Sequence, residues 1–426
     1  MLNIHGWSDR GYLLLNQLER GAKKVDKRTV QIFTDRIPAD IHYGIESNSL
    51  KLKKVKVWVK PASAAVENSL ALDPTDKSIF PNATLSRILA HELFQPGYSE
   101  AVSELLDLGT DEILFSQVPQ LVGSNYGAAI SSFERSSVVG LKKSSGQIRI
   151  CPPLASKVEV GDHIIAIAKN DDSIVYTGVK TQVTDIHARR KSVTKLIQDK
   201  QIVLIIGWSH LGPALVDELT SQLPAGSSIS ILADELKCDS STIPTKGVRG
   251  VTISRASSLS AKRFTHAIVL AYREDIGPHE ADARTVESIR VLKHAIPAAQ
   301  NLRIVAEFFN PAKAQRSQLN DADSTFASEE LAAKLLVQSW TNQDLESVIG
   351  ALFAPGAFAI SFQPIENYVE SGRPITFARL TAAAATRGDS PIGYFKAADG
   401  MQVLINPSKA TIFDTKAGDK MIVISS

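Results

Sequence analysis

Apolar residues recur along this chain in short aliphatic runs and in longer stretches with helical spacing. The runs Ile202–Ile206 and Ala267–Ala271 predict strands buried on both faces, as in a parallel sheet. Between them, residues 212–222 predict an amphipathic helix and residues 228–232 a further strand. A strand, a glycine turn, a helix and a second strand, in that order, predict the opening of a Rossmann-type α/β domain.

The same pattern occurs twice, which indicates an internal duplication. Ile4–Gly11 reads Ile-His-Gly-Trp-Ser-Asp-Arg-Gly, and Ile205–Gly212 reads Ile-Ile-Gly-Trp-Ser-His-Leu-Gly. Two further pairs of blocks align, Phe80–Ala90 with Phe326–Leu336 and Gly161–Ile167 with Gly418–Ile424. Three matching blocks in the same order favour two tandem copies of one module.

The first copy is shorter than the second between its glycine loop and its helical block. In the second copy this interval holds a predicted strand, helix and strand, at 264–272, 284–294 and 302–307. We therefore expect an α/β protein of two modules, each with a Rossmann-type parallel-sheet lobe and a smaller α+β lobe. The first Rossmann-type lobe is expected to be abbreviated. The expected boundaries are 1–79 and 80–176 for the two lobes of the first module, 177–200 for a linker, and 201–326 and 327–426 for the second module.

Composition and charge narrow the classes of function. With 426 residues, 44% of them hydrophobic, the chain is long enough for two or three domains. Lys and Arg number 47 against 45 Asp and Glu, so the net charge of +2 gives no reason to expect a nucleic-acid partner. Only Cys151 and Cys238 are present, which excludes a four-cysteine zinc site and fits a reducing compartment. The longest apolar runs predict no membrane-spanning segment, and no signal peptide is visible.

The glycine loop of the second copy is a candidate cofactor site. The residues that could contact a cofactor are Gly207, Ser209, His210, Gly212 and Asp234. Backbone N–H groups and the helix dipole favour a phosphate there, and Asp234 has the spacing for a ribose hydroxyl. However, Ser209 replaces the middle glycine of the fingerprint, and Trp208 obstructs close approach of a pyrophosphate. Two interpretations stay open: a structural relic, or a site for NAD(H) or an adenine nucleotide. In the first copy, Asp9 would repel phosphate.

Acidic residues provide a candidate metal site. Asp275, Glu280 and Asp282 crowd a loop, and grouped carboxylates suit Ca²⁺. The alternative is a solvated loop whose acids cap the next helix, because no EF-hand spacing is present. Ser209 and His210 could suggest a nucleophile and base, but neighbouring residues rarely give that geometry. The basic segment Lys51–Lys60 alternates as a strand with one charged face, although a phosphate-binding surface is the alternative. No catalytic residue is identified, and an enzyme is not expected.

The order of elements resembles the RCK module, the regulator of potassium conductance. Five segments of the second copy carry a narrower resemblance: Ile206–Trp208, Leu223–Ile231, Ala281–Thr285, Ile304–Phe308 and Leu331–Phe353. In these segments the chain is similar to the cytosolic region of the CASTOR/POLLUX family of ion channels. The Gly-Trp loop in place of Gly-x-Gly is the feature that favours this family over ordinary potassium-uptake subunits.

The resemblance implies a ligand-sensing gating region that regulates ion transport without catalysis. In the family, tandem RCK modules follow a pore and assemble as a homotetrameric gating ring, and calcium binds the soluble region. For this chain it implies a place at the cytoplasmic face of a membrane, self-association and a pore segment as partners. Alternatives are a free-standing subunit like the potassium-uptake regulator TrkA, and an NAD(P)-dependent oxidoreductase. Whether Met1 is a true start or lies inside a longer protein stays open at this point, because helices encoded upstream would favour the channel and a true start codon the free-standing subunit.

Overall fold

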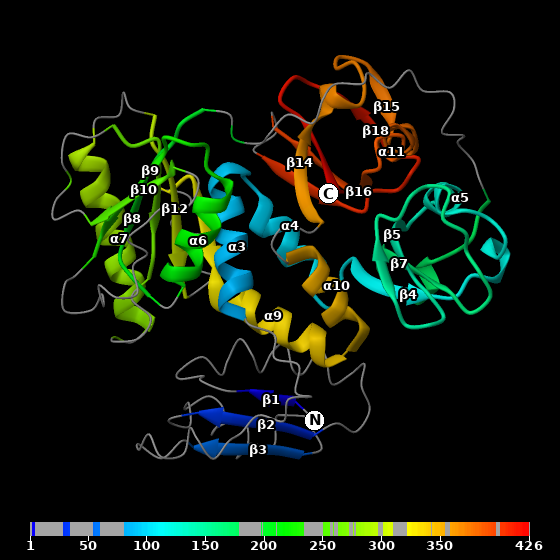
Figure 1. Cartoon of the computed structure of the whole chain (residues 1–426), viewed down its shortest axis with the longest axis horizontal. Helices are drawn as coiled ribbons and strands as arrows, with labels where there is room; N and C mark the ends of the chain where they lie inside the picture. The colour runs from blue at the N-terminus through cyan, green and yellow to red at the C-terminus, as the bar shows by residue number, and fades with distance from the viewer. Residues whose placement is uncertain are drawn as a thin grey trace. The chain divides into compact units, whose positions relative to one another are not determined.

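The computed structural model in Figure 1 describes residues 2–4, 29–34, 54–59, 81–178, 197, 199–209, 211–233, 250–255, 259, 263–271, 276, 278–296, 301–309, 322–341, 343–353, 358–397 and 401–425. The chain divides into two compact units. The sheet unit comprises Met1–Phe94 and Leu196–Asn342, and the small-lobe unit comprises Gln95–Lys195 and Gln343–Ser426. Each unit therefore contains parts of both sequence repeats.

The sheet unit is built on a six-stranded parallel sheet. Its strands are β8 (Ile202–Ile206), β9 (Ser228–Leu232), β10 (Thr252–Arg255), β11 (His266–Val269), β12 (Arg303–Phe308) and β13 (Ser324–Ala327). They lie in the order β10-β9-β8-β11-β12-β13, and every pairing is parallel. Counted along the chain from β8, this is the order 3-2-1-4-5-6 of a doubly wound Rossmann-type sheet. The order reverses between β8 and β11, where such sheets bind ligands at the carboxyl ends of the strands.

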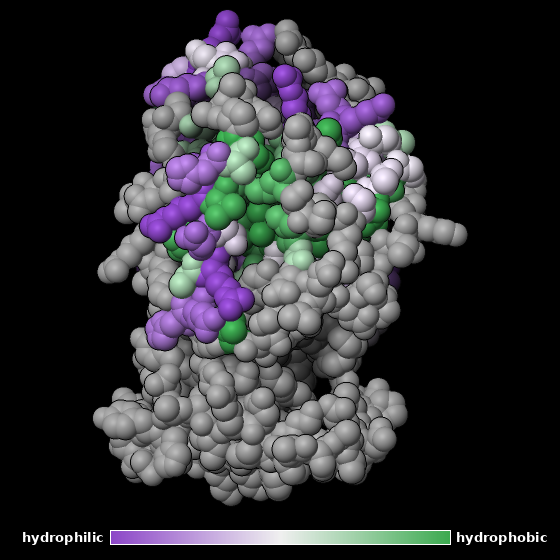
Figure 2. Space-filling model, turned by 90° about the vertical axis from the view of Figure 1, so that its left-hand side faces the viewer, coloured by the Kyte–Doolittle hydropathy of each residue, from purple (hydrophilic) through white to green (hydrophobic). Residues whose placement is uncertain are grey.

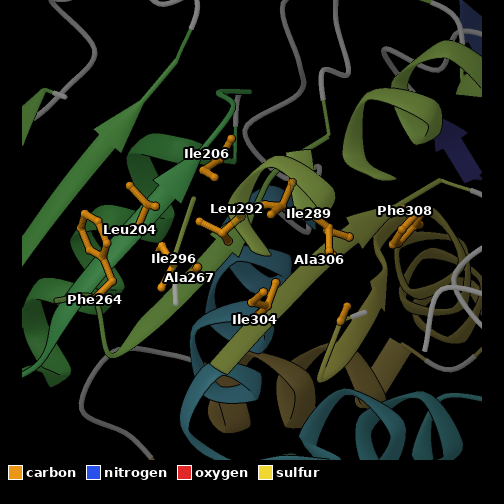
Figure 3. Packing of buried hydrophobic residues seen from close by; sticks show 12 residues of the cluster. Leu204, Ile206, Phe264, Ala267, Ile289, Leu292, Ile296, Ile304, Ala306 and Phe308 are labelled. Atoms are coloured by element: carbon orange, nitrogen blue, oxygen red, sulfur yellow. The ribbon is translucent and has the colours of Figure 1, made fainter. Parts of the chain in front are cut away.

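The hydrophobic core beside this sheet follows from the spacing of apolar residues in its strands and in the helix that covers them. Alternate residues of β8, β11 and β12 share one face of the sheet, which includes Leu204, Ala267 and Ile304. Ile289 and Leu292 of α7 (Pro278–Ala295) cover that face (Figure 3). Their spacing of three residues keeps both side chains on one side of the helix. On the face turned toward the viewer in Figure 2, apolar side chains form a group in the upper half, with hydrophilic side chains above it and along its left side.

Helices from both repeats pack in the sheet unit. These are α3 (Pro81–Phe94), α6 (Gly212–Gln222) and α9 (Ser328–Thr341), and α3 contacts both of the others as well as β11 and β12. Arg87 of α3 forms an ion pair with Glu218 of α6 at 2.7 Å. Arg303 of β12 donates from Nε to the carbonyl oxygen of Leu93 in α3 at 3.0 Å. A helix of the first repeat is thus built into the sheet lobe of the second.

A separate three-stranded sheet belongs to the first repeat. Strands β1 (Leu2–Ile4), β2 (Thr29–Thr34) and β3 (Lys54–Val59) pair in parallel in the order β1-β2-β3. This is the arrangement of β8, β9 and β10, the first half of the larger sheet. In the described part of the first repeat no strands correspond to β11 and β12, but residues 60–80 lie outside the described residues, so the abbreviated lobe stays a prediction.

The small-lobe unit contains two four-stranded antiparallel sheets. The first small lobe has β4 (Glu112–Ser116), β5 (Ser137–Lys142), β6 (Ile148–Ile150), β7 (His163–Ala168) and α5 (Tyr126–Ser131). The second has β14 (Ala359–Pro364), β16 (Ser390–Lys396), β17 (Gln402–Ile405), β19 (Lys420–Ser425), α11 (Phe377–Ala385) and an added pair, β15 (Pro374–Thr376) and β18 (Ile412–Asp414). The sheet orders, β4-β7-β5-β6 and β14-β19-β16-β17, are equivalent. Helices α4 (Tyr98–Leu105) and α10 (Gln343–Phe353) complete the unit.

Two structural details recur in both small lobes. β5 has a bulge between Val138 and Gly140, and β16 has one between Pro391 and Gly393. A Cβ atom at Gly140 would lie 2.5 Å from the carbonyl oxygen of Arg149, and one at Gly393 would meet a carbonyl oxygen of the neighbouring strand in the same way. Only glycine allows the backbones to approach this closely at either bulge.

The Gly-Asp turns before the last strands are equally alike. Asp162 Oδ2 accepts the N–H of Glu159, and Asp419 Oδ2 accepts the N–H of Lys416, both at 2.9 Å. Oδ1 of each carboxylate accepts a further backbone N–H at 3.0 Å. Both aspartates are buried. The shared sheet order, bulge and turn confirm the expected α/β architecture of two tandem modules.

Among the helices of the described residues, none is both long enough and apolar enough to cross a membrane.

Candidate ligand site

The loop after β8 begins with a glycine that the turn requires. Gly207 has φ 82°, in the left-handed region that costs residues with a Cβ atom about 1 kcal/mol or more. Its N–H donates to the carbonyl oxygen of Leu232 at the end of β9 at 2.9 Å. The conformation lets the chain leave β8 and turn sharply toward α6.

Trp208 and Gly212 are in direct contact. The indole is 6% exposed, and a Cβ atom at Gly212 would lie 2.8 Å from three of its ring atoms. Gly212 therefore serves packing against the tryptophan at the first turn of α6. Space that a nucleotide-binding loop leaves beside this helix start is filled here by a side chain, as the sequence predicts.

Ser209 is fixed inside the loop. It is 2% exposed, its Oγ accepts the N–H of Leu211 at 3.3 Å, and its carbonyl oxygen accepts the N–H of Gly212 at 2.8 Å. Ser86 of α3 donates its hydroxyl to the carbonyl oxygen of Leu211 at 3.0 Å. Sequence reasoning missed Ser86, because it lies 125 residues away in the first repeat. His210 and Asp234 lie outside the described residues.

The start of α6 presents the positive end of a helix dipole at the carboxyl edge of the sheet. Its N-cap, Leu211, provides no side-chain acceptor for the first turn, and proline follows the first helical residue. An anionic group that approached this helix end would be stabilised by the dipole and by backbone N–H groups. The geometry suits recognition of charge but contains no reactive pair of side chains among the described residues of the loop.

Two buried carboxylates lie at the ends of β11 and β12. Glu307 of β12 is fully buried, and its Oε2 accepts the N–H of Ala271 at 3.1 Å. Asp282 of α7 is also fully buried, and its Oδ1 accepts the N–H of Phe309 at 2.8 Å. These carboxylates hold the segments that leave the two strands. In the sequence, Glu307 lies in a segment that carries the family resemblance, and its place on a predicted strand gives no sign of this bond.

The three predicted metal ligands have different surroundings. Glu280 is exposed and pairs with Arg284, one helical turn on, at 2.9 Å. Asp282 points inward to Phe309, as described above, and Asp275 lies outside the described residues. Within the ranges that the structure covers, no group of three His, Cys, Asp or Glu side chains could hold a metal ion. The calcium site thus stays a prediction.

The structure also describes Cys151 and part of the basic segment Lys51–Lys60. Burial raises the pKa of Cys151 to about 12, and its Sγ donates to the carbonyl oxygen of Ile424 at 3.3 Å. This thiol is buried and protonated, as expected of a small core side chain. The basic segment around Lys54–Val59 forms β3, which agrees with its interpretation as a strand.

Comparisons with known proteins add independent findings. Residues 82–185 match the family model described as Castor and Pollux, part of voltage-gated ion channel. The ion channel CASTOR of Lotus japonicus is 19% identical over 387 residues, which cover 79% of this chain and 44% of that protein. The probable ion channel POLLUX of Oryza sativa subsp. japonica is 20% identical over 405 residues, 82% of this chain and 41% of that protein.

A solved structure has a similar fold. The human SLO3 gating ring aligns with a TM-score of 0.63 at 10% identity, over 99% of this chain and 98% of that one. The resemblance to CASTOR and POLLUX and the tandem-module fold are therefore confirmed. The chain spans less than half the length of the plant relatives that it matches.

Proposed function

We propose that this chain is the ligand-sensing gating region of a CASTOR/POLLUX-like cation channel, located at the cytoplasmic face of a membrane. The observation that carries the proposal is the extent of the match to proteins named as ion channels, which is about four-fifths of this chain. Because the chain fills less than half of those proteins, a pore would be supplied by another segment or another subunit. Self-assembly into a homotetrameric ring would connect several sensors to one pore.

Two modules would act as the sensing elements. We infer that residues 1–79 and 80–176 form the two lobes of the first module, and residues 201–326 and 327–426 those of the second, joined by 177–200. A ligand does work on such an assembly only if it binds one arrangement of the modules better than another. The role requires no bond to be broken, so we propose that the chain is not an enzyme.

The carboxyl edge of the six-stranded sheet is the proposed sensing site. Its candidate nucleotide contacts are Gly207, Ser209, His210, Gly212 and Asp234, and its candidate calcium ligands are Asp275, Glu280 and Asp282. Two observations support this site. The strand order reverses between β8 and β11, and the N-terminus of α6, the positive end of its dipole, has no side-chain cap among the described residues. Because the Trp208 indole fills the space beside the first turn of α6, a nucleotide would have to contact mainly the solvent-facing side of this loop.

A thermal-shift panel tests the proposal. Ca²⁺, Mg²⁺, NAD⁺, NADH, ATP and AMP are added separately to the full chain, since a ligand that prefers the folded state raises its melting temperature. At one hundred times its Kd, a ligand stabilises the fold by about 2.7 kcal/mol. Asp234→Ala should abolish a nucleotide shift, and Glu280→Ala should weaken a calcium shift.

The matched control is Glu287→Ala, because Glu287 is an exposed acid on the same helix as Glu280. This variant should retain both shifts. The sensing proposal fails if no ligand in the panel changes the melting temperature, or if the variants and the control respond alike. Mass measurement of the purified chain in solution tests the tetramer separately.

A further inference from the structure

A cavity of about 190 Å³ lies between the two small lobes. All of its lining residues belong to the small-lobe unit, whereas the loop after β8 belongs to the sheet unit. One wall comes from α5 and the segment after it, including Glu134. The other comes from the start of α11 and from the segment around Lys409, and it includes Thr381. A second hollow, of about 470 Å³, shares Glu134 and Thr177 with the first.

Lys409 is the main charged group of the cavity. It is 7% exposed, and its Nζ donates to Ser137 Oγ at 3.3 Å and lies 4.5 Å from the centroid of the Phe377 ring. Among the residues that the structure describes, no carboxylate forms an ion pair with it. Burial lowers the pKa of Lys409 to about 7, although the negative charge of Glu134 acts in the opposite direction. A buried amine without an ion pair is costly to the fold, so its presence in a cavity wall is informative.

Thr381 of α11 provides a second polar group, a buried hydroxyl that lacks a hydrogen bond among the described residues. The residue is 2% exposed, and within the described part of the chain its hydroxyl has no hydrogen-bond partner. A buried hydroxyl that makes no bond costs about 1–3 kcal/mol. Because less than 1 Å² of this oxygen is accessible, an acceptor atom inside the cavity would remove this cost after a rotation of the Thr381 side chain.

Two other polar groups of the walls, the Glu134 carboxylate and the N–H of Ala378, form hydrogen bonds within the protein. Glu134 Oε1 accepts the Ser408 hydroxyl at 2.6 Å and the N–H of Ala410 at 3.0 Å, which fastens one small lobe to the other. The N–H of Ala378, in the first turn of α11, donates to the carbonyl oxygen of Lys409 at 2.9 Å. These bonds shape the cavity, and the Lys409 ammonium and the Thr381 hydroxyl are two donors in its walls.

We propose that this cavity binds a small organic carboxylate, whose oxygens accept hydrogen bonds from Lys409 and Thr381. The volume is below the 300–1,000 Å³ typical of larger ligands, and Ile130 and Phe133 provide apolar wall for a short carbon chain. A single ammonium can balance the charge of one monoanion. The nearby Glu134 carboxylate would repel a phosphate dianion more strongly than a monoanion. The site is separate from the proposed sensing edge of the parallel sheet, so it adds a second ligand class to this chain.

Binding should be coupled to uptake of a proton. A carboxylate next to Lys409 favours the charged ammonium and raises its pKa above that of the empty cavity. The charged groups that line the two hollows, besides Lys409, are Glu134, Arg135 and Asp172. Hydrogen bonds through Ser137 and Asn406 also connect Lys409 to Asp111. Above pH 7 the affinity should fall about tenfold for each pH unit, because the amine must first be protonated.

Calorimetric titration of the full chain tests the proposal, with acetate, propionate and L-lactate as probes. Propionamide is the neutral isostere, and inorganic phosphate is the competing anion. We expect binding of a carboxylate with uptake of nearly one proton at pH 8.5 and nearly none at pH 5.5, measured in buffers of different ionisation enthalpy. Lys409→Met should weaken binding at least about tenfold and abolish proton uptake, and Thr381→Val should weaken it about three- to tenfold.

Controls separate the site from its surroundings. Lys157→Met removes an exposed lysine of the first small lobe and should leave affinity and proton uptake unchanged. Asp111→Asn should leave proton uptake in place, which assigns the proton to Lys409. The proposal is overturned if no carboxylate binds at 20 mM, if propionamide or phosphate binds as tightly, or if Lys409→Met binds like the wild type. None of these results bears on the nucleotide and calcium panel.

Discussion

At the residue scale, the contact between Trp208 and Gly212 decides what the loop after β8 can accept. The indole occupies space beside the first turn of α6, and the absence of a side chain at Gly212 makes this possible. The pattern Gly-Trp-Ser-x-x-Gly therefore has a packing reason for its last glycine. That reason is independent of any phosphate.

Gly212→Ala is expected to destabilise the sheet unit by about 1–3 kcal/mol, because the new methyl group must displace the indole or the helix. Chemical denaturation followed by tryptophan fluorescence measures the change. Ser221→Ala, at an exposed position of the same helix, should change the stability by less than about 0.5 kcal/mol. Equal stability of Gly212→Ala and the wild type would mean that the contact is not maintained in solution.

At the scale of elements, the local patterns gave the most accurate predictions. The helix expected at 212–222 and the strand expected at 228–232 have those bounds, since both are set by short-range periodicity and flanking turns. The strands β5, β6, β16 and β17 were not delimited from the sequence. They are three to seven residues long and are defined by antiparallel partners far along the chain.

Burial of polar groups was the least predictable part of the candidate site. The sequence predicts Asp282 on a solvated or calcium-binding loop, and it gives no sign that this carboxylate accepts the N–H of Phe309 in the core. A carboxylate near a loop looks the same in sequence whether it points to solvent or to a backbone amide. Similarly, Lys409 and Thr381 gave no signal, because their cavity exists only when two lobes from different repeats pack together.

The duplicated bulges lead to a paired prediction. Gly140→Ala and Gly393→Ala should each destabilise the small-lobe unit by about 3 kcal/mol or more, since a carbonyl oxygen of the neighbouring strand cannot move aside easily. Gly350→Ala in α10 is the control, because no heavy atom lies within 4 Å of its added methyl group. It should stabilise the protein by about 0.5–1 kcal/mol. Thermal unfolding checks all three, and a large difference between the two bulge variants would contradict their equivalence.

At the scale of the whole molecule, the two units should respond differently to acid. Burial lowers the pKa of His91 and of His266, both in the sheet unit, to about 4. Each contributes stability that is present above its unfolded pKa near 6.5 and is lost as the pH falls through 4. In the small-lobe unit, burial, with added repulsion from Asp111 and Glu100, raises the pKa of Glu104 to about 7. Its contribution is present below about pH 4.5 and is lost as the pH rises through 7.

Hydrogen exchange at pH 5 and 7, corrected for intrinsic rates, measures this difference. Peptides from β8 and β11 should lose protection at pH 5 relative to peptides from β7 and β19. The double variant His91→Gln, His266→Gln should weaken the pH dependence of the sheet unit, and His279→Gln, at an exposed position of α7, should not. Parallel loss of protection in both units would contradict the assignment to these histidines.

The division of the chain into units determines which fragments of the protein can be expected to fold separately. The polypeptide passes between units after Phe94, after Lys195 and after Asn342, so each paired helix block contributes one helix to each unit. A fragment ending near residue 200 would lack the partners of α3, and its complement would lack the helix that α6 and Arg303 contact. Neither half is a self-sufficient piece, and the two should be soluble only when they are produced together and reassociate.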